Sequence, residues 1–175
     1  MSSKNRVYRM VLSAMFLAIA LVLPFLTGQI PQIGKALSPM HIPVILCGFF
    51  CGPFYALAVG LITPLLRFAL FSAPQMPLGF VMCFELAAYG FFAGLFYRLL
   101  PDKKPFVYVS LVCAMLAGRV IWGIGRTILF GLGSVEFGWA MFIAGGFVNA
   151  VPGIIVQIVL IPILVMALGK YARKD

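Results

Sequence analysis

The chain has 175 residues, of which 63% are hydrophobic and only 10% are charged, and its formal net charge is +9. Its mean hydropathy of +1.12 excludes an ordinary soluble protein, and a chain of this length is expected to form one domain. We therefore predict a single integral-membrane domain over residues 1–175, whose basic residues meet anionic lipid headgroups and not nucleic acid.

Prolines, glycines and charged residues divide the sequence into six apolar segments. In chain order we expect spans at residues 7–26, 39–52, 53–72, 78–100, 105–131 and 138–168. About 20 apolar residues cross the hydrocarbon core as an α-helix, so the second segment is short for a full span. Pro64, Pro152 and Pro162 fall inside segments, which membrane helices tolerate. The runs lack the alternation of barrel strands, so the predicted fold is an all-α membrane protein with six transmembrane helices.

The distribution of basic residues orients these six helices. If the spans alternate, three basic groups fall on one side of the membrane: Lys4, Arg6 and Arg9; Arg98, Lys103 and Lys104; Lys170, Arg173 and Lys174. The opposite loops carry only Lys35 and the acidic Glu136 as charged residues. By the positive-inside rule, both termini are expected to be cytoplasmic.

The expected spans contain four ionisable residues, namely Arg67, Glu85, Arg119 and Arg126. A charge in the bilayer costs several kcal/mol unless it is paired or hydrated, so each is a candidate functional residue. At about 1.5 Å per helical residue, Arg119 lies near the membrane centre and the other three lie toward the outside. His41 is expected at the outer surface, and Asn149 in the outer half of the sixth span.

Arg119, Trp122 and Arg126 share one helix face, because their spacing is i, i+3 and i+7. Two guanidinium groups suit a ligand with a carboxylate or phosphate, and the indole could cover an apolar part of it or stack on a guanidinium. Alternatively, Glu85 neutralises Arg67 or Arg126 to fix helix packing, and Arg119 bonds to helix carbonyls. Three arginines against one glutamate would still leave positive charge for an acidic ligand or for water.

Two further polar residues have equally open roles. His41 either contacts a ligand or anchors a loop, and Asn149 either contacts a ligand or forms an interhelical hydrogen bond. The sequence has no Ser/His/Asp set and no metal-ligand spacing, so we predict no catalytic residue and no metal site. An intramembrane enzyme that uses Glu85 and His41 as acid and base, or a small anion channel, is the weaker alternative.

Ala14 and Ala18 form a small-residue face on the first helix. Such a face lets another helix approach closely, either within the same bundle or from another membrane protein. The second reading makes the first helix a docking surface.

Together these features resemble the substrate-binding S components of energy-coupling factor (ECF) vitamin transporters. The resemblance covers nearly the whole chain, through the basic N-terminus, the six spans, and the runs Ala14–Ala18, Met40–Val44, Cys51–Pro53 and Gly60–Pro64. It implies a subunit of the bacterial cell membrane that binds a vitamin at its outer side without a cofactor. It also implies docking through Ala14 and Ala18 on a membrane coupling protein (T component) that works with two cytoplasmic ATPases. The chain has no Gly-Lys-Ser/Thr phosphate loop, so ATP hydrolysis would be the task of those ATPases.

The resemblance also points to a class of substrate. The runs Gly118–Gly123 and Phe147–Gly153 look most like the pantothenate branch, and arginines suit the single carboxylate of pantothenate. Hydroxymethylpyrimidine, pyridoxine, folate and other vitamins are the alternative substrates. The residues expected to bind substrate are His41, Arg67, Glu85, Arg119, Trp122, Arg126 and Asn149.

Overall fold

The computed structural model describes residues 3–27, 39–76, 78–101, 103–131 and 150–169. In these residues every regular element is a helix, which confirms the expected all-helical fold. The elements are α1 (Ser3–Val22), the 3-10 helix η1 (Leu23–Thr27), α3 (His41–Cys51), α4 (Pro53–Phe71), α5 (Leu78–Leu99), α6 (Lys104–Gly131) and α8 (Val151–Ala167).

Four helical stretches are long and apolar enough to cross a membrane: Ser3–Phe25, Pro53–Phe71, Leu78–Leu99 and Lys104–Leu129. They agree with the first, third, fourth and fifth expected spans, and they make the chain a multi-pass membrane protein. α3 and α8 are shorter apolar helices of 11 and 17 residues. The second and sixth spans therefore stay predictions, and Asn149 lies outside the described residues.

α3 is short and completely enclosed. Each of its residues, from His41 to Cys51, is buried, as expected for a helix that is apolar on nearly every side. It ends at Gly52, whose φ of 100° is a conformation that only glycine adopts readily. Its 11 residues extend about 16 Å, roughly half of the hydrocarbon thickness, and its first residue, His41, is only 4% exposed and so lies inside the bundle.

The centre of the fold is α5, which packs against α3, α4 and α6. Glycines let the backbones approach at these contacts. A Cβ atom on Gly48 of α3 would lie 2.5 Å from the carbonyl oxygen of Gly90, and one on Gly60 of α4 would lie 2.5 Å from the nitrogen of Ala87. Because real Cβ atoms do not come so close to backbone, larger residues would separate α3 and α4 from α5.

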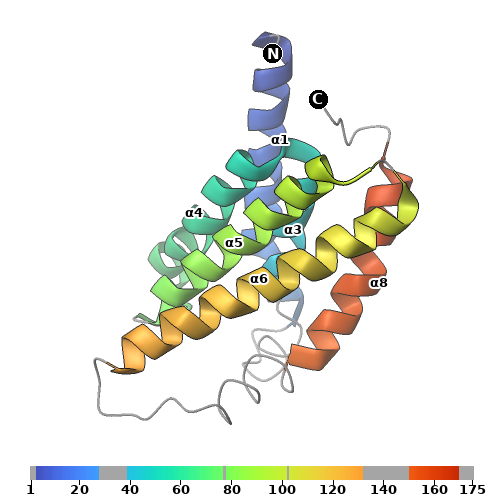
Figure 1. Cartoon of the computed structure of the whole chain (residues 1–175). Coiled ribbons are helices and arrows are strands. Elements are labelled where there is room, and N and C mark those ends of the chain that lie inside the picture. Colours follow the sequence, from blue (N-terminus) through green and yellow to red (C-terminus); the bar gives the residue numbers. More distant parts are fainter. Residues whose placement is uncertain (1–2, 28–38, 77, 102, 132–149, 170–175) are drawn as a thin grey trace.

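Figure 1 shows how the remaining helices are arranged around this centre. α6 (yellow to orange) runs obliquely across α5, and α8 (red) lies beside the N-terminal half of α6. The start of α1 and the end of α8 lie toward the same end of the bundle. Pro152, expected inside a span, falls in the first turn of α8, where its missing N–H has no helical acceptor to lose.

α1 packs on the bundle through one face only. Its buried residues are Arg9, Ser13, Phe16 and Ala20. Ala14 and Ala18 are exposed on the other side, among exposed apolar neighbours that include Val11, Met15 and Ile19. The small-residue face is therefore not used for packing within the described part of the bundle.

Candidate functional site

A carboxylate inside the bundle joins three helices. Glu85 of α5 is only 3% exposed, and its Oε1 lies 3.2 Å from Nη1 of Arg119 on α6 and 3.4 Å from Nε2 of His41 on α3. Both partners are buried as well. Since a buried charge is costly unless it is paired, this ion pair explains how Glu85 and Arg119 are accommodated in an apolar core. We call these three residues the Glu85 cluster.

The helices bring the cluster together at a defined depth. Glu85 lies about two turns, or roughly 10 Å, from the start of α5. Tyr89 follows one turn later on the same face, fully buried, with its ring edge-on to His41 at 4.8 Å between ring centroids. The guanidinium of Arg119 lies 6.0 Å from the centroid of the same Tyr89 ring. The Tyr89 ring therefore contacts both partners of Glu85, His41 and Arg119.

This arrangement corrects two expectations. From sequence, Arg67 and Arg126 were considered as partners of Glu85, whereas the structure places Arg119 and His41 against its carboxylate. Arg119, which was considered as a packing residue bonded to helix carbonyls, donates to the carboxylate of Glu85. The cause is geometric, because the oblique path of α6 and the short α3 bring Arg119 and His41 to the level of Glu85.

Arg126 and Trp122 lie further along the same face of α6. The Arg126 guanidinium is 5.1 Å from the centroid of the Trp122 ring, a cation–π contact that agrees with one of the two roles considered for the indole. Trp122 is buried and Arg126 is half-buried. On the opposite face Leu116, Val120, Ile124 and Ile128 are all exposed, so the face that bears the arginines is the one turned inward.

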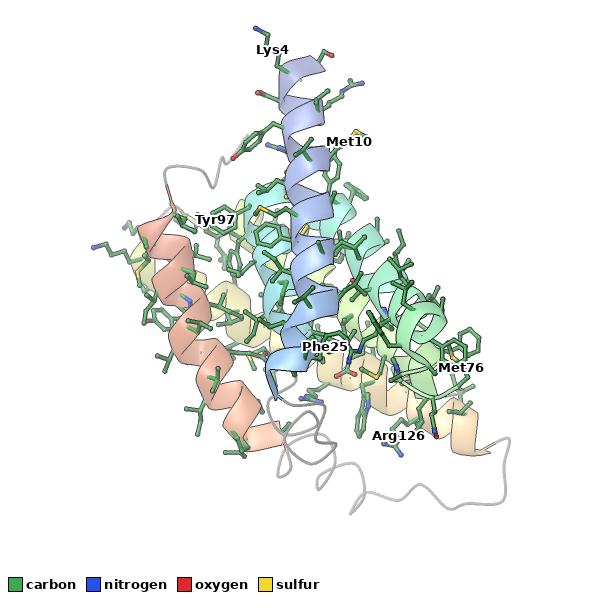
Figure 2. The ribbon with its side chains drawn as sticks, turned by 180° about the vertical axis from the view of Figure 1, so that it is seen from behind. Lys4, Met10, Phe25, Met76, Tyr97 and Arg126 are labelled. Carbon is green, nitrogen blue, oxygen red and sulfur yellow. The ribbon has the colours of Figure 1, made fainter. Side chains whose placement is uncertain are left out.

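Arg67 belongs to a different contact. Its Nη1 donates a hydrogen bond of 2.9 Å to the carbonyl oxygen of Leu21 in α1. Its guanidinium also lies 5.4 Å and 5.6 Å from the ring centroids of Phe25 and Phe71. Arg67 therefore ties α4 to the end of α1, and the structure does not show it joining the Glu85 cluster. Figure 2 labels Phe25 and Arg126 near one end of the bundle and Lys4 at the other.

The electrostatic balance of this half of the bundle is positive. Glu85 is the only acidic residue in the part of the chain that the structure describes, against Arg67, Arg119 and Arg126. The carbonyl that accepts from Arg67 carries no net charge. These four side chains therefore sum to +2 (three positive charges and one negative), which favours an anion as an additional occupant.

Several buried polar atoms have no hydrogen-bond partner among the described residues. They include Nδ1 of His41, Nε of Arg119 and Oε1 of Gln157. Gln157, on α8, is only 2% exposed. Buried polar atoms are normally satisfied, so open ones mark places where a ligand or water completes the structure.

Tyr89 was missed by sequence reasoning, although its position four residues after Glu85 puts it on the same helix face. Gly118 makes room for it. A Cβ atom on Gly118 would lie 2.6 Å from Cδ2 and Cε2 of the Tyr89 ring. The sequence signal that could have indicated this contact is the glycine, Gly118, directly before the buried Arg119.

We expect Gly118→Ala to lower the free energy of unfolding by about 1–3 kcal/mol, because the new methyl group forces the Tyr89 ring out of its place. Gly125→Ala on the same helix is the matched control. Its Cβ would meet only the Val81 side chain, with the nearer methyl at 3.1 Å, and the better helix propensity of alanine offsets part of the cost of that contact. Reversible unfolding in mixed micelles measures both variants, and equal losses would contradict this role of Gly118.

Comparison with known proteins yields one match. A family model described as "ECF transporter, substrate-specific component" matches residues 8–165, which is most of the chain. No curated protein and no solved structure matches the chain.

Proposed function

Because this chain belongs to the family of ECF transporter substrate-specific components, we propose that it binds pantothenate and delivers it for import across a bacterial plasma membrane. Membership makes the chain the substrate-specific membrane subunit of such a transporter, and not an enzyme. The substrate, the location of its site and the residues that bind it are the proposed part.

The choice of an acidic substrate rests on the excess of positive charge around Glu85, whose carboxylate is already paired. Glu85 already accepts from Arg119 and His41, so it offers little to a cationic vitamin. Arg126 is half-buried and stacked on Trp122, in reach of a ligand that enters from its end of the bundle. A guanidinium fork binds a carboxylate by two parallel hydrogen bonds. Pantothenate supplies one carboxylate for Arg126, and the indole can cover part of its apolar chain.

The direct test is a titration of the purified, detergent-solubilised subunit with pantothenate. We expect saturable one-to-one binding that excess pyridoxine or thiamine does not displace, because neither competitor carries a carboxylate for Arg126. Isothermal titration calorimetry measures it. Mass spectrometry of the ligand that co-purifies with the subunit is the independent check, and recovery of a cationic vitamin would overturn the proposed substrate.

The proposed topology has six spans, with both termini in the cytoplasm. The basic residues near Lys4 lie at the opposite end of the bundle from Arg126, as Figure 2 shows. This separation supports a site open to the outside, because the positive-inside rule assigns the Lys4 end to the cytoplasm. Arg126 would then lie nearer to the entrance, and the Glu85 cluster deeper.

The proposed partners are a T component and two cytoplasmic ATPases, as is general for this family. The exposed Ala14 and Ala18 support α1 as the contact with the T component, since their short side chains allow close helix approach. The buried side of α1, through Phe16 and Ala20, is already occupied by the bundle. We therefore assign the exposed side to the partner.

We expect Ala14→Trp to abolish vitamin uptake in cells while leaving the affinity of the isolated subunit unchanged. The indole would separate α1 from the T component, yet Ala14 is exposed and lies about two helical turns from Leu21, which contacts Arg67. Val120→Trp on the exposed face of α6 is the control and should retain uptake. Uptake and ligand affinity are measured on the same variants. Lost affinity in Ala14→Trp would mean that this side of α1 is not a docking surface.

A further inference from the structure

His41 is the only histidine of the chain, and one of its ring nitrogens has a hydrogen-bond partner among the described residues whereas the other has none. Nε2 of His41 lies 3.4 Å from Oε1 of Glu85, at the long end of hydrogen-bond geometry. Nδ1 is buried and has no hydrogen-bond partner among the described residues. The residue as a whole is only 4% exposed. An open acceptor or donor in such a place costs free energy that a ligand can recover.

The contacts of Glu85 decide which of the two nitrogens carries the proton. The guanidinium of Arg119 is always charged and lies 3.2 Å from the same oxygen, which keeps Glu85 an ionised carboxylate that can only accept. Nε2 must therefore donate to Glu85. Glu85 and Tyr89 on α5 contact His41, and Arg119 on α6 binds the same Oε1 atom of Glu85.

The charge on the ring follows from the same neighbours. Arg119 already balances the single negative charge of Glu85, so a second cation on the same oxygen would leave the cluster with a net positive charge in an apolar interior. A neutral imidazole avoids this net charge and leaves Nδ1 with a bare lone pair. The buried, unsatisfied atom is then an acceptor that needs a donor.

Resting on the proposed function, we propose that Nδ1 of His41 accepts a hydrogen bond from a hydroxyl or amide N–H of the substrate, and that Glu85 is the positioning residue that fixes the tautomer. Arg119, the partner of Glu85, lies about two helical turns, or roughly 10 Å, from Arg126 on α6. The site therefore selects an elongated ligand, with an acid at one end and a donor group toward the other. A short acid without such a donor leaves Nδ1 open and binds more weakly.

The single histidine makes this proposal directly measurable. The full-length subunit is labelled with ¹⁵N-histidine, purified through an affinity tag that contains no histidine, and placed in lipid nanodiscs for nitrogen NMR. We expect one protonated and one unprotonated ring nitrogen, with the proton on Nε2. Saturation with pantothenate should move the unprotonated Nδ1 resonance toward that of a hydrogen-bonded nitrogen. An imidazolium, a proton on Nδ1, or an unmoved Nδ1 resonance with pantothenate bound would each overturn the proposal.

A ligand series provides the second readout. An analogue of pantothenate without its hydroxyl groups should bind roughly tenfold or more weakly than pantothenate to the unmodified subunit. In His41→Phe, which keeps a ring against Tyr89, the two ligands should bind equally. If the affinity lost on removing the hydroxyl groups is the same in His41→Phe as in the unmodified subunit, the role of His41 would be overturned. Failure of pantothenate to bind at all would refute the proposed substrate, whereas the ligand-free spectrum would still decide the tautomer.

Discussion

Arg126→Ala is expected to weaken pantothenate binding by about 2–4 kcal/mol, or roughly 30- to 700-fold. The guanidinium stacks on the buried Trp122 ring at 5.1 Å from its centroid, so it is positioned before the ligand arrives. Its removal would leave the ligand carboxylate desolvated without a partner. Calorimetric titration of the purified variant measures the loss.

Two controls isolate the contribution of the guanidinium. Arg126→Lys keeps the positive charge but loses the planar fork, so we expect it to recover only part of the affinity. Arg6→Ala removes an exposed arginine near the start of α1, at the other end of the bundle from Arg126. This variant should bind pantothenate like the unmodified subunit. Undiminished binding by a variant that combines Arg119→Ala with Arg126→Ala would refute arginine binding of an acid altogether.

Much of the helical framework could be predicted from apolar length and punctuation. Expected spans such as 53–72 and 78–100 end within one residue of α4 and α5. Each lies between glycine, proline or charged residues that stop an apolar run. The shared face of Arg119, Trp122 and Arg126 also followed from the helical period alone. These features depend only on local sequence, which is why they were predictable.

The partners within the site could not be predicted in the same way. By depth, Arg67 and Arg126 were the expected partners of Glu85 and Arg119 was expected to lie deeper, whereas the oblique path of α6 and the tight glycine contacts of α5 bring Arg119 to Glu85. His41 was expected at the outer surface because it opens the second apolar segment. Its place beside Glu85 depends on the length of α3, which ends at Gly52 after 11 residues. The angle at which α6 crosses α5 and the position of the short α3 are set by tertiary packing, so local sequence does not predict them.

Arg67 lies apart from the Glu85 cluster, so its burial has a different explanation. The hydrogen bond to Leu21 gives Arg67 a structural reason for being buried. Arg126 has a half-buried position and an aromatic surface beside it. The four charged residues thus divide into an anchor for α1 (Arg67), an ion pair in the core (Glu85 and Arg119) and a candidate ligand contact (Arg126).

Glu85→Leu is expected to destabilise the subunit by about 3–5 kcal/mol, because it leaves Arg119 buried without its carboxylate and removes the acceptor of His41. Reversible unfolding in mixed micelles measures the free energy of unfolding. The double variant Glu85→Leu with Arg119→Met replaces both charges by apolar groups of similar size. We expect it to recover all but about 1–3 kcal/mol, the cost of leaving His41 without an acceptor. Equal losses in the single and double variants would mean that Glu85 and Arg119 are not energetically coupled.

The same double variant separates stability from function. If it folds but no longer binds pantothenate, the ion pair serves the ligand, since an apolar pair would have held the three helices together as well. Retained affinity would instead make the Glu85 cluster a packing device and confine the site to Arg126 and Trp122. The cluster then could not set the tautomer for a ligand, and Nδ1 of His41 would have to show no shift on binding. The two experiments must therefore agree, because both depend on whether the substrate reaches the level of Glu85.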